Sequence, residues 1–426
     1  MKTRKFKITE LKVVGISALG GALEFYDFMI FAFLANTISP QFFPATEHIN
    51  SLLGLFGAFT VGYLARPIGG LIFSHYGDLR GRKNAFYFSI ILMAIPSLLI
   101  AILPNYQQIG VLAPVFLVLL RVVQGIAMGG EIPGAITFTF EHVGTNKRGR
   151  AIVLIFFALS LATLFGQGII ALLHQVLTTE EFTQWGWRVA FLIGAILGVF
   201  GANLRKNLSE TPLFKTTSVK QEEGYIPSLF LVKNYLLQFI QAVSILCLSA
   251  VSMFLLFVYM PTYLTNFRVS HSLTTSHIQL FNTVNLGLFS LFMLLFGYLS
   301  DYLGRKKLVV IGSFLLLVLS YPSFNALLNG SQYAVFLSLI ILGVSFSLVA
   351  SSYGAMLAEL FPSKVRYTGV GLTYNVAIAA LGGTTPLIAT YIIKITNNPL
   401  MPAYYLMLFA GLSLLGSLTI RANKLY

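Results

Sequence analysis

Long apolar runs alternate with short polar connections along the whole chain. A helix needs about 20 apolar residues to cross the roughly 30 Å hydrocarbon core of a bilayer. Twelve runs meet this length, which predicts an all-α membrane protein with twelve transmembrane helices. The expected spans are 13–38, 52–76, 84–104, 110–140, 151–177, 187–204, 236–264, 278–300, 308–328, 332–358, 368–393 and 402–420.

One connection is much longer and more polar than the others, and it covers residues 205–234. It separates six predicted spans from six. This predicts an N-terminal six-helix bundle at 1–204, a linker at 205–234 on the same side of the membrane as both termini, and a C-terminal six-helix bundle at 235–426.

A short motif occurs once in each half. Residues 77–83 read Gly-Asp-Leu-Arg-Gly-Arg-Lys, and residues 300–306 read Ser-Asp-Tyr-Leu-Gly-Arg-Lys. Their aspartates, Asp78 and Asp301, lie 223 positions apart, at equivalent points of the two halves. A weak internal repeat of this kind in an apolar chain is typical of transporters.

The composition agrees with a membrane protein. The chain is 56% hydrophobic and 10% charged, with a mean hydropathy of +0.81, whereas a soluble domain is roughly 25% charged. The single cysteine, Cys247, excludes an intrachain disulfide and a cysteine metal cluster. The six histidines are scattered without metal-ligand spacing, and no pair of nucleophile and base is readable, so we expect neither an enzyme nor a cofactor.

The net charge of +14 would suggest a nucleic-acid partner in a soluble protein. Its distribution gives a different explanation. Of the 28 Lys and Arg residues, 23 fall at the two termini and in the connections on one side of the predicted membrane, and only Arg188, Arg268 and Lys394 fall on the other. Because basic connections stay in the cytoplasm, we expect both termini to be cytoplasmic and no nucleic acid to bind.

Ionisable residues inside the predicted spans are the first candidates for function, because each costs on the order of 3 kcal/mol to insert. Glu24 and Asp27 are three residues apart and share one helix face. In the fourth span, Arg121, Gln124 and Glu131 fall within an arc of about 80°. We expect both faces to point inward. The set in the first half is Glu24, Asp27, Arg66, Arg121 and Glu131.

Two arginines oppose three carboxylates in this set, which leaves one acid without a fixed cation. A buried acid in that position favours its protonated form near neutral pH, as a proton-coupled carrier requires. The alternative interpretation is a static lattice of salt bridges that only packs the helices. Pro133 is expected to kink the fourth span near Glu131.

The spans of the second half contain neutral polar and aromatic residues in place of charges. Tyr259, Tyr374 and Asn375 offer hydrogen bonds and aromatic faces that suit a substrate whose charge is met by the first half. Each could equally form a hydrogen bond between helices.

These motifs resemble the major facilitator superfamily, through Gly297 with 301–306 (Asp-Tyr-Leu-Gly-Arg-Lys) and through 121–125 (Arg-Val-Val-Gln-Gly). More narrowly, they resemble its metabolite:proton symporters over nearly the whole chain. The stretches that carry this narrower resemblance are 21–28 (Gly-Ala-Leu-Glu-Phe-Tyr-Asp-Phe), 65–70 (Ala-Arg-Pro-Ile-Gly-Gly), 121–131, 185–188 (Trp-Gly-Trp-Arg), 210–212 (Glu-Thr-Pro), 259–264 (Tyr-Met-Pro-Thr-Tyr-Leu), 359–362 (Glu-Leu-Phe-Pro) and 366–369 (Arg-Tyr-Thr-Gly).

The resemblance implies two six-helix bundles of the major facilitator type that import an organic acid or zwitterion with protons. It implies a multi-pass protein of the bacterial inner membrane, which we expect to be monomeric and to have only substrate, protons and lipid as partners. A proton-driven exporter on the same fold is the alternative. In the first motif, Leu79 and Ser74 replace the usual basic residue and glycine, which predicts a weaker latch at Asp78 than at Asp301.

The expected site residues follow from the residues and the resemblance together. Proton coupling is expected at Glu24, Asp27 and Glu131. Substrate binding is expected at Arg66, Arg121, Gln124, Tyr259, Tyr374 and Asn375. Gating is expected at Asp78, Arg82, Asp301 and Arg305.

Overall fold

The computed structural model describes residues 6–80, 82–206, 227–268, 273–362 and 366–420. In these ranges the chain is built from helices, and no strand occurs. The helices of the first half are α1 (Ile8–Phe33), α2 (Ala35–Phe42), α3 (His48–Leu64), α4 (Arg66–Arg80), α5 (Arg82–Ile102), α6 (Tyr106–Ile109), α7 (Leu112–Met128), α8 (Glu131–His142), α9 (Arg148–Val176), α10 (Thr179–Glu181) and α11 (Trp187–Lys206). Those of the second half are α13 (Pro227–Met253), α14 (Met260–Phe267), α15 (Thr275–Leu303), α16 (Arg305–Asn329), α17 (Gln332–Leu360), α18 (Arg366–Ala377), α19 (Thr385–Thr396) and α20 (Met401–Thr419).

The described residues account for all twelve predicted spans. Ten helical segments are long and apolar enough to cross a bilayer, and the pair formed by α1 and α2 makes an eleventh, bent by 67°. The remaining predicted span, 84–104, coincides with the shorter apolar helix Phe88–Ile102 inside α5. The predicted all-α fold with twelve transmembrane helices is confirmed.

Several spans that the sequence predicts as single helices are broken. The second span breaks at Ala65, and the fourth breaks at Gly129 and Gly130, near the kink expected from Pro133. Proline has no N–H to donate to the carbonyl four residues earlier. Pro133 therefore leaves the Gly129 carbonyl without its α-helical partner, and Pro261, just after a π-helical turn at Phe254–Tyr259, has no N–H to donate to the Phe257 carbonyl.

Both carbonyls form hydrogen bonds that join the two halves. Asn375 Nδ2, in the second half, donates to the Gly129 carbonyl at 3.0 Å. Gln167 Nε2, in the first half, donates to the Phe257 carbonyl at 3.4 Å. The helix breaks thus supply polar contacts inside an apolar interface.

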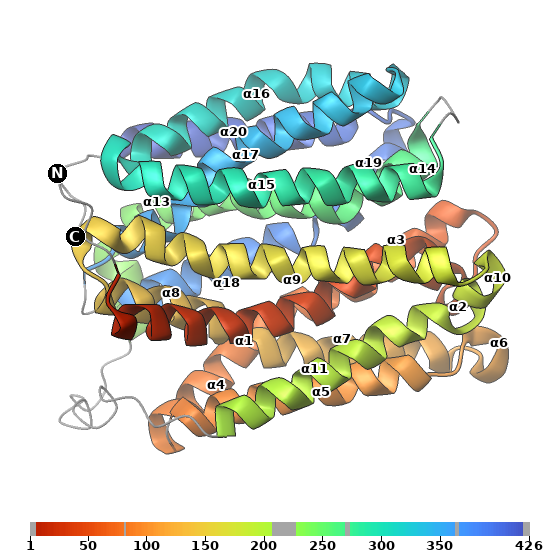
Figure 1. The fold of residues 1–426 in the computed structure, drawn as a ribbon, viewed down its shortest axis with the longest axis horizontal. Helices are drawn as coiled ribbons and strands as arrows, with labels where there is room; N and C mark the ends of the chain where they lie inside the picture. Colours follow the sequence, from red (N-terminus) through yellow and green to blue (C-terminus); the bar gives the residue numbers. More distant parts are fainter. Residues whose placement is uncertain (1–5, 81, 207–226, 269–272, 363–365, 421–426) are drawn as a thin grey trace.

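The two halves form two layers, with most of the first half below and most of the second above in Figure 1, while α18 of the second half reaches down to the level of α1 and α8. At their interface α9 lies along α15, α3 contacts α19, and α8 contacts α18. The helices α5 and α11 of the first half, and α16 and α20 of the second, pack chiefly within their own half. The start of α1 and the end of α20 lie at the same end of the molecule, which we call the terminal end (Figure 1).

Candidate functional site

A buried polar network links three helices of the first half around Asp27. This α1 side chain is 3% exposed and accepts a hydrogen bond from Ser97 Oγ on α5. Gln124 on α7 donates from Nε2 to Asp27 Oδ2 at 2.7 Å and accepts at Oε1 from Arg121 NH1, also at 2.7 Å. Gln124 therefore connects the carboxylate of Asp27 to the guanidinium of Arg121.

Arg121 is held in a box of three phenylalanines. Its Cζ atom lies 3.7 Å from the ring centre of Phe28, 4.4 Å from that of Phe31 and 5.7 Å from that of Phe59. The side chain is fully buried, and its Nε and NH2 atoms have no hydrogen-bond acceptor among the described residues. Cation–π attraction to the three rings offsets part of the cost of burying this charge.

Arg66 is a second fully buried guanidinium, and it lies where the two halves meet. Its Cζ atom is 5.4 Å from the ring centre of Tyr63 in the first half and 5.7 Å from that of Tyr374 in the second. None of its three nitrogens has a hydrogen-bond acceptor among the described residues. Because an uncompensated buried charge is costly, this position is suited to an anionic group of a ligand.

Residues of the second half complete this part of the interface. Asn375 follows Tyr374 in α18 and is the residue that bonds the Gly129 carbonyl, while its own Oδ1 atom has no partner among the described residues. Phe254 packs edge-on against Tyr63, with the ring centres 5.1 Å apart. The structure thus brings together the predicted residues Arg66, Tyr374 and Asn375.

Tyr259 lies elsewhere on the same interface. Its hydroxyl accepts a hydrogen bond from Thr390 Oγ1 at 3.1 Å, and its ring contacts Phe56 of the first half at 5.7 Å between ring centres. The contacts of Tyr259 are those of a residue that packs helices, as the sequence also allowed.

Glu24 and Glu131 are both buried, at 2% and 4% exposure. They belong to α1 and α8, which pack against each other. Among the described residues, no group of three or more His, Cys, Asp or Glu side chains could hold a metal ion.

Asp301 joins the two halves at the terminal end. Its carboxylate accepts from the backbone N–H of Gly149 at 3.0 Å and of Arg150 at 3.3 Å, and from Arg150 Nε at 3.2 Å. The acceptor thus caps the N-terminus of α9, where the helix dipole favours negative charge. Arg305 donates to the same carboxylate at 3.1 Å and also pairs with Glu359.

A second ion pair crosses the interface at this end, because Arg366 of the second half lies 3.2 Å from Glu141 of the first. The side chains of Asp78 and Arg82 lie outside the described residues. The predicted ranking of the two latches therefore stays a prediction.

The halves are also joined at the opposite end and near the middle. Lys394 Nζ donates to Asn50 Oδ1 at 2.5 Å, and Asn266 Nδ2 donates to Asn36 Oδ1 at 3.1 Å. Thr60 Oγ1 donates to the Gly383 carbonyl at 3.0 Å. Polar contacts thus connect the two halves at both ends of the molecule.

Sequence reasoning missed several partners in these sites. They are Ser97, the three phenylalanines around Arg121, Tyr63, and Arg150. Ser97 had a weak signal, as a hydroxyl next to Pro96 in an apolar run, and Phe28 and Phe31 follow Asp27 within about one helical turn. Arg150 belongs to the basic connection that the sequence assigned only to topology.

Comparisons with known proteins agree with this architecture. A model of the Major Facilitator Superfamily matches residues 18–290 and 242–423. A putative proline/betaine transporter of Staphylococcus aureus (strain MSSA476) is 35% identical over 416 residues, which is 96% of this chain and 87% of that protein. The glycine betaine/proline/ectoine/pipecolic acid transporter OusA of Dickeya dadantii (strain 3937) is 31% identical, and the match covers 97% of this chain and 84% of OusA.

A solved structure of the proton:xylose symporter XylE, bound to 6-bromo-6-deoxy-D-glucose, has the same fold. Its TM-score is 0.78 at 15% sequence identity, and the match covers 96% of this chain and 94% of that one. These findings confirm the resemblance to metabolite:proton symporters that the sequence motifs indicated. The chain belongs to the major facilitator superfamily and is a multi-pass membrane transporter, not an enzyme.

Proposed function

We propose that this transporter imports a small zwitterion that carries a carboxylate, coupled to protons. The two six-helix bundles, 1–204 and 235–426, rock about a site near the middle of the membrane. The closed contacts at both ends of the interface are the two gates of this cycle. The one observation that carries the proposal is the fully buried guanidinium of Arg66, which has no acceptor among the described residues.

Arg66 is the anchor for the substrate carboxylate. A guanidinium binds a carboxylate through two parallel hydrogen bonds. The nitrogens of Arg66 form no hydrogen bond of good geometry among the described residues, and the Tyr63 hydroxyl is near enough to interact with them. The rings of Tyr63 and Tyr374 are in cation–π contact with the Arg66 guanidinium itself, and once the carboxylate neutralises Arg66 these aromatic rings are suited to a substituted ammonium group. This pairing of an arginine with aromatic rings suits zwitterions such as proline and betaine, which the names of the bacterial relatives specify.

Asp27 is the proton-carrying group of this mechanism. Its Oδ1 atom has no hydrogen-bond partner among the described residues, while Oδ2 is bound by Ser97 and Gln124. A proton taken up at the carboxylate removes its negative charge and weakens the bond from Gln124, and this loosens the position of Arg121. Protonation of Asp27 therefore affects α7, the helix that carries Arg121. This helix packs against both α3 and α4.

Orientation and location follow from the distribution of basic residues and from the relatives. Both termini face the cytoplasm of a bacterial inner membrane, because most Lys and Arg residues flank the spans on that side. The working unit is a single chain, since each chain contains both halves of the proposed site.

The test is transport by the purified protein in proteoliposomes loaded with buffer of controlled pH. Radiolabelled proline and glycine betaine should accumulate when protons are more concentrated outside, and uptake should fall to equilibration when the gradient is collapsed. Accumulation driven by the opposite gradient would identify an exporter instead.

Two variants separate the proposed roles. Asp27→Asn should abolish gradient-driven accumulation but retain exchange of labelled for unlabelled substrate, because exchange needs no net proton movement. Arg66→Gln should lose both activities. Glu24→Gln and Glu131→Gln are the comparison variants. Gradient-driven accumulation that survives in Asp27→Asn would refute the assignment of the proton to that residue.

A further inference from the structure

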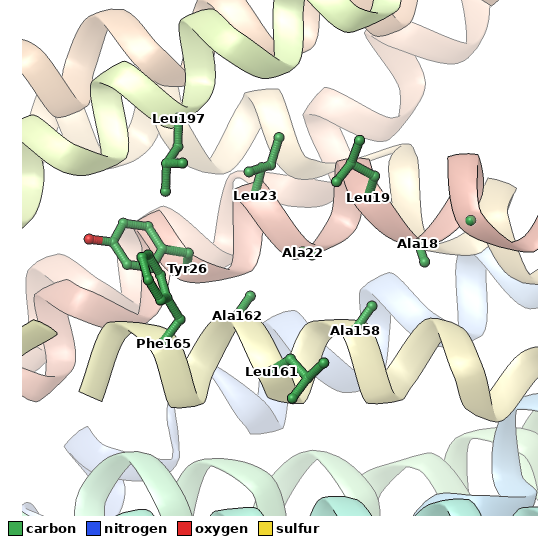
Figure 2. Close-up of a pocket in the computed structure, with 11 residues that line it drawn as sticks. Ala18, Leu19, Ala22, Leu23, Tyr26, Ala158, Leu161, Ala162, Phe165 and Leu197 are labelled. Atoms are coloured by element: carbon green, nitrogen blue, oxygen red, sulfur yellow. The ribbon is translucent and has the colours of Figure 1, made fainter. Parts of the chain in front are cut away.

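An apolar groove of about 390 Å³ lies on the outside of the first half, away from the interface between the halves. Figure 2 shows its walls, which come from α1, α9 and α11. Of the lining side chains only Tyr26 has a polar atom, and its hydroxyl is used in a hydrogen bond to the Ala190 carbonyl at 3.1 Å. The groove therefore offers hydrocarbon and no polar anchor.

Small residues at matching heights on two helices make part of its lining. Both α1 and α9 begin at the terminal end, at Ile8 and Arg148. Ala18 and Ala22 of α1 lie ten and fourteen residues from that start, and Ala158 and Ala162 of α9 lie at the same distances from theirs. On α1 the lining begins at Gly15, seven residues after Ile8, so the groove starts about 10 Å inside the helix end at 1.5 Å per residue.

Two aromatic rings bound the groove at its deeper end. Tyr26 and Phe165 lie next to each other in Figure 2, with ring centres 5.6 Å apart. Toward the terminal end the lining includes the small residues Gly15, Ala18 and Ala158 together with Leu19. A linear molecule would therefore enter from the membrane leaflet at the terminal end and stop against these rings near mid-membrane.

We propose that this groove binds one acyl chain of a bilayer phospholipid from the leaflet at the terminal end. The groove is continuous with the lipid-facing surface, as the exposure of Leu19 and Leu161 (44% each) shows. Within the bilayer, hydrocarbon is the solvent that meets such a surface. At the start of α9, Lys147 is buried and paired with Glu10 at 3.0 Å. Lys7 at the start of α1 is exposed, and its charge favours an anionic headgroup there.

The position of the groove gives the bound chain a mechanical role. Tyr26 directly precedes Asp27, and its hydroxyl ties α1 to α11. Tyr26 is 1% exposed and Phe165 is 50% exposed. An acyl chain in the groove therefore meets the Phe165 ring, which packs on Tyr26, and supports α1 through it at the level of the proposed proton site. The binding itself does not depend on which substrate is carried, so its test needs no transport.

The test is photo-cross-linking in proteoliposomes with phosphatidylglycerol that carries a diazirine in mid-chain, diluted in unlabelled lipid. Peptide mapping should find label concentrated on residues 19–26 and 158–165. Ala162→Leu, which fills the groove, should lower this labelling at least fivefold and leave the label at lipid-facing Leu172 unchanged. Ala158→Leu is the second filling variant, in case the first does not fold.

Gly168→Leu is the matched control. It adds the same side chain on the same helix, where no atom lies within 4 Å of the added Cβ position, and it should leave labelling of the groove unchanged. Labelling of the groove and of Leu172 in proportion to exposure, without response to Ala162→Leu or Ala158→Leu, would show bulk lipid contact only and overturn the proposal. An unlabelled groove would overturn it as well.

Discussion

Replacing Asp301 with Asn should open the terminal end of the transporter. The Asp301 carboxylate is 2% exposed and makes three hydrogen bonds to Gly149 and Arg150 across the interface. A hydrogen bond to a charged group contributes about 1.5–3 kcal/mol, but Asn keeps one acceptor oxygen, and the Arg150 side chain is partly exposed, which lowers the value of the pair.

We therefore expect a net loss of about 2 kcal/mol from the closed state relative to the state that is open at this end. At 1.36 kcal/mol per factor of ten, this shifts the ratio of closed to open molecules by roughly 30-fold. A shift of this size is large enough to change which state predominates.

Distances between two spin labels would measure this shift. Asn146 and Lys307 are exposed residues at the terminal end on opposite halves, and each can be replaced by a labelled cysteine. The single native cysteine, Cys247, is buried and can be changed to Ala for this purpose. In the wild type, short distances should dominate, whereas Asp301→Asn should show a new population at longer distance.

Tyr302→Phe is the control for this experiment. It changes the neighbouring residue and removes only an exposed hydrogen bond to the Tyr298 hydroxyl, at 3.2 Å. It should leave the distances unchanged. If Asp301→Asn also leaves them unchanged, the Asp301 contacts do not hold the terminal end closed, and the reasoning fails.

Three further predictions concern other contacts. Lys394→Ala removes the hydrogen bond to Asn50 and should favour opening at the opposite end by about 1 kcal/mol. Spin labels placed at that end should show longer distances. A population that opens only at the terminal end would contradict this prediction. Arg66→Lys keeps the charge but loses the bidentate fork, so KM for uptake should rise tenfold or more, and an unchanged KM would argue against a carboxylate at this position. Tyr26→Phe loses the bond to the Ala190 carbonyl and should destabilise the fold by about 1 kcal/mol, measured as a lower thermal unfolding temperature in detergent; an unchanged temperature would show that this bond contributes nothing.

The fold could be predicted from the sequence because each helix that crosses the bilayer needs about 20 apolar residues. Every run of sufficient length is helical in the structure, either as one helix or as two helices joined at a break. The internal repeat around Asp301 marked where the second half returns to the terminal end. The helix breaks were only partly readable. Pro133 predicts the break in the fourth span, but the 67° bend after Phe33 has no proline or glycine at the break that would predict it.

Part of the candidate site could also be predicted from the sequence, because the bilayer penalises buried charges. The cost of a charge in hydrocarbon singled out Asp27, Arg66 and Arg121 from the sequence. Their partners depend on which helices become neighbours, and Ser97 lies 70 residues from Asp27 in the chain. The hydrogen bond from Asn375 to the Gly129 carbonyl is predictable only on one side. The position of Pro133, four residues later, identifies the carbonyl that lacks a helical donor, but the sequence does not identify Asn375 as the donor.

The network around Asp27 also has a consequence for how the protein is made. Arg121 enters the membrane in the span Leu112–His142, whose mean hydropathy of 1.9 favours insertion despite the charge. In order of synthesis, Asp27 and Ser97 precede it, so the acceptor side of the network is already in the bilayer when Gln124 and Arg121 arrive. The Asp27 carboxylate is then in place to accept the hydrogen bond from Gln124 when α7, the helix that carries Arg121, inserts into the membrane. An Asp27→Asn variant should accordingly reach the membrane in smaller amounts as well as transport differently.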